Sequence, residues 1–149
     1  MRIRRLGPVI SILAALLVAG TASAAPPAVT VITIDVNFIT GETFTATGGV
    51  VCDSGVAVSD PALVAGGGRQ GRGVFTFHLI KTLTCDDGSG SFMIMVDAAT
   101  APRSPGTLGA FVVLGGTGDY SGLRGAGSLI GTSLSETEIL DVYTGRLSN

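Results

Sequence analysis

Apolar and β-branched residues occur in this chain as short runs that Gly, Asp, Ser or Pro interrupt. Across residues 29–38, for example, Ile32 and Ile34 alternate with Thr33 and Asp35. A period of two places every second side chain on the same face of a strand and is typical of a sheet with one buried face. No stretch after the first 24 residues has the apolar spacing of an amphipathic helix. The sequence therefore predicts an all-β fold.

Seven or eight strands are expected, with turn residues at intervals of about 8–12 positions and with 56–65 as the weakest run. The expected runs are 29–38, 42–52, 56–65, 74–85, 92–99, 107–114, 127–134 and 138–147. The short connections favour antiparallel order. We predict a single small antiparallel eight-stranded barrel, with a two-sheet sandwich as the alternative, because glycines within the runs favour the bends that close a curved sheet. The glycine-rich segment 66–73 is expected to be a loop.

The first 24 residues have the pattern of a cleavable export signal. Arg2, Arg4 and Arg5 precede an apolar stretch, residues 6–20, that is too short to span a bilayer comfortably. Ala22-Ser23-Ala24 then provides a small-x-small cleavage pattern. We expect residues 1–24 to be a signal peptide and residues 25–149 to be the barrel domain. An uncleaved membrane anchor is the alternative.

Cleavage would leave 6 basic and 11 acidic residues, a formal net charge of −5. An acidic chain with scattered arginines is not a nucleic-acid binder by charge. No second apolar run of about 18 residues follows. The protein is therefore expected to be secreted to the extracellular space, with neither a nucleic acid nor, after cleavage, a membrane as its partner.

Cys52 and Cys85 are the only cysteines. In an exported chain, two cysteines most simply form one disulfide. That bond would constrain the unfolded chain by roughly 3.8 kcal/mol in the chain-entropy model. A metal pair or a reactive thiol is the alternative, but there is no Cys-x-x-Cys motif and His78 is the only histidine.

Few side chains suggest chemistry. His78 is expected at the surface, on the face opposite Phe75 and Phe77, and a general base needs a partner that the spacing does not reveal. Lys81 interrupts that apolar face. Three aspartates could supply oxygen ligands but lack the Asp-x-Asp spacing of a calcium loop: Asp86, Asp87 and Asp97. A solvated acidic stretch is expected around the last turn: Glu136, Glu138 and Asp141. We therefore predict no catalytic residue, no metal site and no cofactor.

Between residues 114 and 127 there are six glycines in fourteen positions: Gly115, Gly116, Gly118, Gly122, Gly125 and Gly127. A nucleotide-binding loop is disfavoured because Gly-Lys-Ser/Thr is missing and the following residues are β-like. Glycine is favoured where the backbone needs a positive φ or where another segment lies too close for a Cβ atom. We expect a structural glycine corner, with a tight turn at residues 115–118 and with Tyr120 and Arg124 as packing or surface groups.

The order of these motifs carries a resemblance. Gly-Gly-Thr-Gly, the spaced Tyr120, Gly-Leu-Arg-Gly-x-Gly and Tyr143-Thr144-Gly145 resemble the C-terminal half of dirigent and allene-oxide-cyclase-like barrels. The segment 85–92 is similar to one in small secreted bacterial relatives of those proteins. The resemblance covers about 35 residues and implies a calycin-like eight-stranded barrel. The plant relatives bind a small apolar molecule in the barrel and steer a cyclisation or radical coupling, but their catalytic residues have no counterparts that can be matched here.

These observations support a secreted, non-catalytic small barrel that binds an apolar small molecule or a component of the cell exterior. A cyclase- or isomerase-like enzyme that orients a reactive ligand is one alternative. A purely structural or interaction protein of the cell exterior is the other. The sequence leaves the ligand-binding residues and the oligomeric state open.

Overall fold

The computed structural model describes residues 26–66, 73–101, 104 and 106–149. The predicted signal peptide, its cleavage site and most of the predicted loop at 66–73 lie outside these residues. Within the described part of the chain, no helix is long and apolar enough to cross a membrane.

The described chain forms nine strands and a short 3-10 helix. These elements are β1 (Ala28–Asn37), β2 (Gly41–Thr47), β3 (Ser54–Ser59), β4 (Leu63–Gly66), β5 (Phe75–Cys85), β6 (Ser91–Thr100), β7 (Gly106–Gly116), η2 (Gly118–Tyr120), β8 (Arg124–Ser133) and β9 (Glu138–Ser148).

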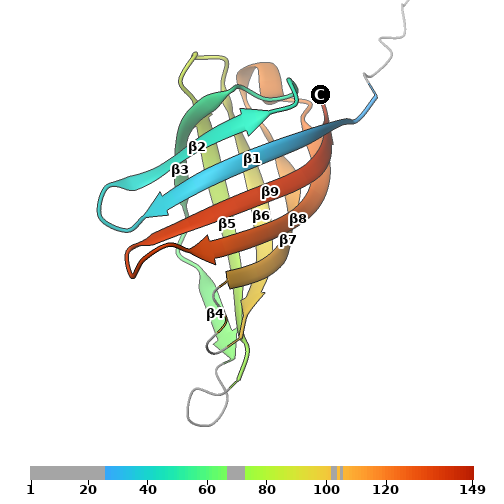
Figure 1. Ribbon diagram of the computed structural model, residues 1–149. Coiled ribbons are helices and arrows are strands. Elements are labelled where there is room, and N and C mark those ends of the chain that lie inside the picture. Colours follow the sequence, from blue (N-terminus) through green and yellow to red (C-terminus); the bar gives the residue numbers. More distant parts are fainter. Residues whose placement is uncertain (1–25, 67–72, 102–103, 105) are drawn as a thin grey trace, which may run out of the picture.

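Eight of the strands form a closed antiparallel barrel (Figure 1). Neighbours follow the order β3-β2-β1-β9-β8-β7-β6-β5, and β3 also pairs with β5 through five residue pairs, which we call the closing ladder. The predicted all-β, eight-stranded antiparallel barrel is confirmed, and the sandwich alternative is wrong.

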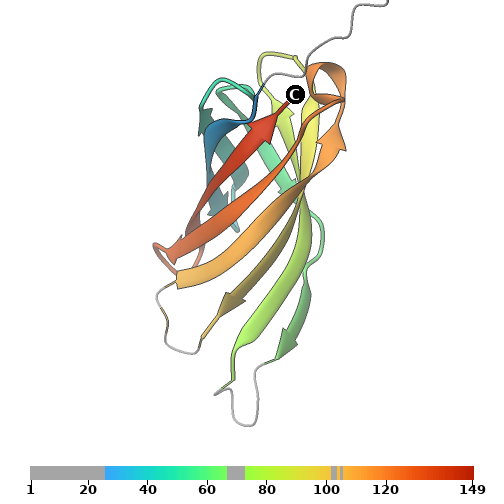
Figure 2. The same ribbon diagram turned by 90° about the vertical axis from the view of Figure 1, so that its right-hand side faces the viewer.

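The ninth strand, β4, comes from a run that the sequence predicted as one strand, 56–65. The structure divides this run after Ser59: the Asp60 amide still donates to the Ile80 carbonyl (2.9 Å), but Pro61 has no N–H to continue a ladder. Whereas β3 pairs with both β2 and β5, β4 pairs only with β5. Figure 2 shows β4 and the adjoining part of β5 extending beyond the barrel.

Two other predicted boundaries differ from the structure. The expected strand 42–52 ends at Thr47, since Gly48 and Gly49 turn the chain with φ values of 111° and 70°. The expected strand 127–134 begins earlier, because Arg124 already pairs with Ser148 of β9.

The inward face of each barrel strand carries the apolar residues of the alternating pattern. The fully buried apolar side chains include Ile32, Ile34, Leu83, Phe92, Ile94, Val96, Tyr143 and Leu147. Aromatic rings pack edge to face: the centroids of Phe44 and Phe92 are 6.1 Å apart, and those of Phe111 and Tyr143 are 5.5 Å apart. Large side chains thus fill the barrel interior around these aromatic rings.

Cys52 and Cys85 form the expected disulfide, with their Cα atoms 6.0 Å apart. Cys85 is the last residue of β5 and pairs with Gly55 of β3, and Cys52 lies just before β3. The covalent bond therefore lies at one end of the closing ladder.

Replacing both cysteines by serine is expected to lower the free energy of unfolding by roughly 2–5 kcal/mol, because the unfolded chain loses a cross-link. Denaturant melts of the variant and of the oxidised wild type measure this change. Thiol titration of the denatured, unreduced protein should detect no free thiol. Two reactive thiols would contradict the assignment.

The glycine corner connects β7 to β8, but its geometry differs from the predicted turn. β7 continues through Gly116, with a register shift opposite Met93 and Ile94, and η2 then makes the corner. Positive φ values occur at three of its glycines: Gly115, Gly118 and Gly125. A Cβ atom at Gly116 would lie 2.5 Å from the Ser91 carbonyl oxygen, and one at Gly125 would lie 2.3 Å from that of Arg146. Gly122 has no such constraint, since its only near atom is Asn149 Oδ1 at 3.4 Å.

Gly116→Val and Gly125→Val are each expected to reduce the free energy of unfolding by more than about 1 kcal/mol, because a side chain collides with backbone at both positions. Gly122→Val is the matched control from the same corner and is expected to change it by less than about 0.5 kcal/mol. Denaturant melts compare the three variants. Equal stabilities would contradict the structural role.

Candidate functional site

Polar side chains gather inside the barrel wall, on its outer surface and at its disulfide end. The inner group begins with Lys81, whose side chain is only 4% exposed. The Lys81 Nζ atom lies 2.6 Å from Glu42 Oε2 and 2.7 Å from Ser59 Oγ, and the Ser59 hydroxyl donates to Glu42 Oε1 at 2.8 Å. Since Ser59 and Lys81 are the last pair of the closing ladder, this ion pair lies at the end opposite the disulfide.

Asp141 and Tyr143 of β9 complete the inner group. Burial raises the pKa of Asp141, and the positive charge of Lys81 partly offsets that rise. Burial and the neighbouring charge of Asp141 raise the pKa of Tyr143, so its phenol stays protonated and donates to Asp141 Oδ2 at 3.2 Å. A Cβ atom at Gly131 would lie 2.5 Å from Asp141 Oδ1, so the missing side chain makes room for this carboxylate.

The predicted face of Lys81 is confirmed, but the predicted solvated surroundings of Asp141 are wrong. Lys81 shares the inward face of β5 with the fully buried Leu83, as the alternation indicated. Asp141 was expected in a solvated acidic stretch, yet it alternates with Tyr143 and faces inward. Inward alternation from Tyr143 was the signal that could have placed it.

Chemically, the inner group consists of two hydrogen-bonded sets, Lys81 with Glu42 and Ser59, and Tyr143 with Asp141. A buried charge without a partner is costly, whereas a paired and hydrogen-bonded one is tolerated. The arrangement supports the wall of the barrel and leaves little of Lys81 accessible to a substrate.

Lys81→Met is expected to lower the free energy of unfolding by about 3 kcal/mol, because it leaves the Glu42 carboxylate buried without a cation. The double variant Lys81→Met/Glu42→Gln should recover part of this loss. A double-mutant cycle from denaturant melts measures the coupling. Additive effects of the two substitutions would contradict a coupled pair.

The raised pKa of Asp141 gives a pH dependence with a definite sign. The Asp141 carboxyl keeps its proton to a higher pH in the folded protein than in the unfolded chain. Its contribution to the free energy of unfolding is therefore complete below the ordinary pKa of 3.8 and is lost as the pH rises through the raised pKa. Relative to wild type, Asp141→Asn should therefore become more stable as pH increases from about 3 to about 7. Denaturant melts across this range test it. A difference that does not change with pH would contradict it.

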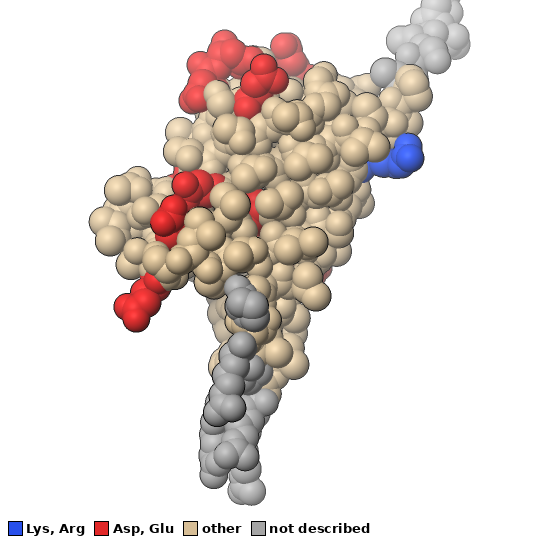
Figure 3. All heavy atoms as spheres, in the orientation of Figure 1, with Lys and Arg blue, Asp and Glu red and all other residues tan. Residues whose placement is uncertain are grey.

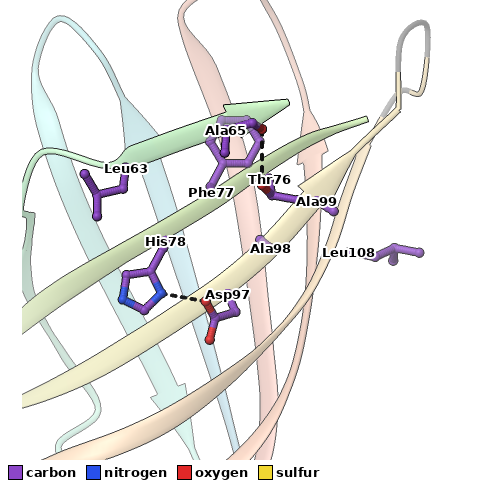
Figure 4. A pocket seen from close by; sticks show the side chains of 9 residues that line it. All are labelled: Leu63, Ala65, Thr76, Phe77, His78, Asp97, Ala98, Ala99 and Leu108. Carbon is purple, nitrogen blue, oxygen red and sulfur yellow. Dashed lines mark hydrogen bonds and ion pairs between the residues drawn. The ribbon is translucent and has the colours of Figure 1, made fainter. Parts of the chain in front are cut away.

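The outer group borders a groove of about 430 Å³ where β4, β5, β6 and β7 adjoin. Nine residues line it: Leu63, Ala65, Thr76, Phe77, His78, Asp97, Ala98, Ala99 and Leu108. Val96 and Ala98 are buried in the barrel, so the alternate residues Asp97 and Ala99 face outward. Leu63 and Leu108 lie on opposite sides of the groove (Figure 4).

His78 and Asp97 are the only ionisable side chains among the residues that line the groove. They are direct partners in the β5–β6 register, and His78 Nδ1 lies 2.6 Å from Asp97 Oδ1. Their side chains are 47% and 64% exposed. His78 is at the surface, as predicted, but the sequence analysis missed its partner. His78 and Asp97 are each six positions from the Thr84–Ser91 pair, the first pair of this hairpin, so the hairpin register was the signal that could have paired them.

The three aspartates considered as metal ligands lie in two separate places. Asp86 accepts a hydrogen bond from the Ser54 hydroxyl (2.9 Å), and Asp87 accepts from the amide of Ser89 (2.9 Å), at the disulfide end of the barrel. Hydrogen bonds from Ser89 lower the pKa of Asp87. Asp97 lies on the groove instead. Among the residues that the structure describes, no three His, Cys, Asp or Glu side chains form a group that could hold a metal ion.

Tyr120 and Arg124 contact neighbouring residues of the barrel. The Tyr120 ring is buried against Phe92, with centroids 5.6 Å apart, and its hydroxyl lies 2.8 Å from Ser89 Oγ. Arg124 is exposed and its Nε donates to Ser148 Oγ.

Comparisons with protein-family models, with curated proteins and with solved structures give no match for this chain.

Proposed function

We propose that this protein is a secreted, non-catalytic barrel that binds an apolar small molecule in the outer groove. The groove carries this proposal. Its volume falls within the usual range for small-molecule sites, about 300–1,000 Å³, and aliphatic side chains with one polar pair form most of its lining.

The inner group supports a non-catalytic role over the cyclase- or isomerase-like alternative. Its ionisable side chains do converge, but Lys81 is paired with Glu42 and nearly inaccessible, and Asp141 accepts from the Tyr143 hydroxyl. The resemblance to dirigent and allene-oxide-cyclase-like proteins is thus proposed as one of architecture, without transfer of their reactions.

Secretion is part of the proposal and is supported by two features. The first 24 residues have the pattern of an export signal. The disulfide is of the kind that persists in oxidising compartments.

A second candidate role, interaction with another component of the cell exterior, is favoured by the outer surface of the barrel. On the face that includes β1 and β9, Figure 3 shows the acidic residues mainly at the upper edge and on the left, with mostly uncharged surface between them. Large apolar side chains are also exposed on β7 and β8, among them Leu114 and Ile130. Apolar surface of this kind is typical of contact regions.

The apolar probe 2-methoxynaphthalene tests the groove. We expect it to bind the wild-type protein and to shift the backbone amide signals of Ala65 and Ala99 in an NMR titration. Leu63→Asn/Leu108→Asn should weaken binding about fivefold or more, because both apolar walls are lost. These side chains are 73% and 67% exposed, so the fold should tolerate the change.

Leu114→Asn is the matched control, since Leu114 is exposed on the same strand as Leu108 but does not line the groove. It should leave the dissociation constant unchanged. No binding to the wild type, or equal weakening by the control, would overturn the proposed site.

A further inference from the structure

We infer that the His78–Asp97 pair makes the groove selective for apolar ligands that carry a hydroxyl group, such as a phenol or an alcohol. This inference rests on the proposed binding function and assigns the ligand class. The pair supplies one hydrogen-bond acceptor beside an apolar wall, and the ligand hydroxyl would donate to it.

When the imidazole is neutral, the geometry of the pair determines which of its nitrogens is the acceptor. A carboxylate can only accept hydrogen bonds, so the proton between His78 Nδ1 and Asp97 Oδ1 belongs to the imidazole. In a neutral imidazole with its proton on Nδ1, the other nitrogen, Nε2, is an acceptor. Figure 4 shows that nitrogen on the side of the ring away from Asp97. No described residue forms a hydrogen bond with it.

The surroundings argue against two other uses of the imidazole. The Thr76 hydroxyl, the only hydroxyl in the lining, donates to the Ala65 carbonyl at 3.1 Å and is not activated by His78. A metal ion would find only His78 and Asp97 as ligands among the lining residues, too few for a protein site. The remaining use is recognition of a donor on the ligand.

The charge of the groove decides which polar group it accepts. The nine lining residues include no Lys or Arg, and Asp97 is acidic. A ligand carboxylate would meet an acceptor nitrogen and a like charge, so it would lose its hydration without a partner. A hydroxyl can donate to Nε2 and carries no charge to desolvate. An ether of the same shape fills the same apolar space but has no proton to donate.

Three probes with the same ring system separate these chemistries: 2-naphthol, 2-methoxynaphthalene and 2-naphthoate. In NMR titrations of the wild-type protein, 2-naphthol should bind about three- to tenfold more tightly than the ether, which is the usual effect of one hydrogen bond. The carboxylate should bind most weakly.

His78→Leu replaces the partly exposed imidazole by an apolar side chain of similar size that cannot form a hydrogen bond. The preference for 2-naphthol over the ether should fall to about one, with the affinity for the ether changed less than twofold. Asp97→Ala should reduce the preference by releasing the ring, and Asp97→Asn should restore part of it because an amide oxygen can accept from Nδ1–H. Asp97 is thus a positioning residue.

The outcomes distinguish this inference from the function on which it rests. If no probe binds the wild type, the proposed function fails. If naphthol and ether bind equally well, or if naphthoate binds best, the groove is a binding site but the hydroxyl selectivity is wrong. Retention of the preference in His78→Leu would also overturn the inference.

Discussion

Closure of the barrel depends on the ladder of five residue pairs between β3 and β5. Without it, the remaining pairings describe an open sheet with β3 at one edge. The inward faces of opposite strands could not then bury one another. The disulfide lies at one end of this ladder and the Lys81–Glu42 ion pair at the other. A short ladder is therefore supported by a covalent bond and by an ionic contact that β2 supplies from its inward face.

The sequence contained enough information for the fold but not for the contacts between strands. Alternation located the strands and placed Lys81 among the inward residues. The predicted export signal implied an oxidising compartment, in which the two cysteines were expected to form a disulfide. The run 56–65 was predicted as one strand although Ser59, Asp60 and Pro61 interrupt its apolar residues, and it is at this interruption that β3 ends. Alternation along a strand indicates which face of the sheet a residue occupies. It does not indicate which strands pair in the folded protein.

The same limit explains what was missed at the candidate site. The partner of Lys81 lies 39 positions away, on a strand that is not its sequence neighbour. The partner of His78 lies 19 positions away on the next strand and is set by the hairpin register, which begins at the Thr84–Ser91 pair. Burial of Asp141 depends on the space left at Gly131 of the adjacent strand. Each of these facts requires the register of a pair of strands.

The outer groove depends on β4, a strand that closure of the barrel does not require. β4 makes four residue pairs with β5, no other described strand pairs with it, and its four residues are all exposed. Local opening there breaks few contacts and leaves the closing ladder intact. The amides of β4 should therefore exchange with solvent through low-energy fluctuations, while those of β1 and β9 exchange only when the barrel unfolds. One wall of the groove can thus move on its own timescale, independently of the stability of the domain that carries it.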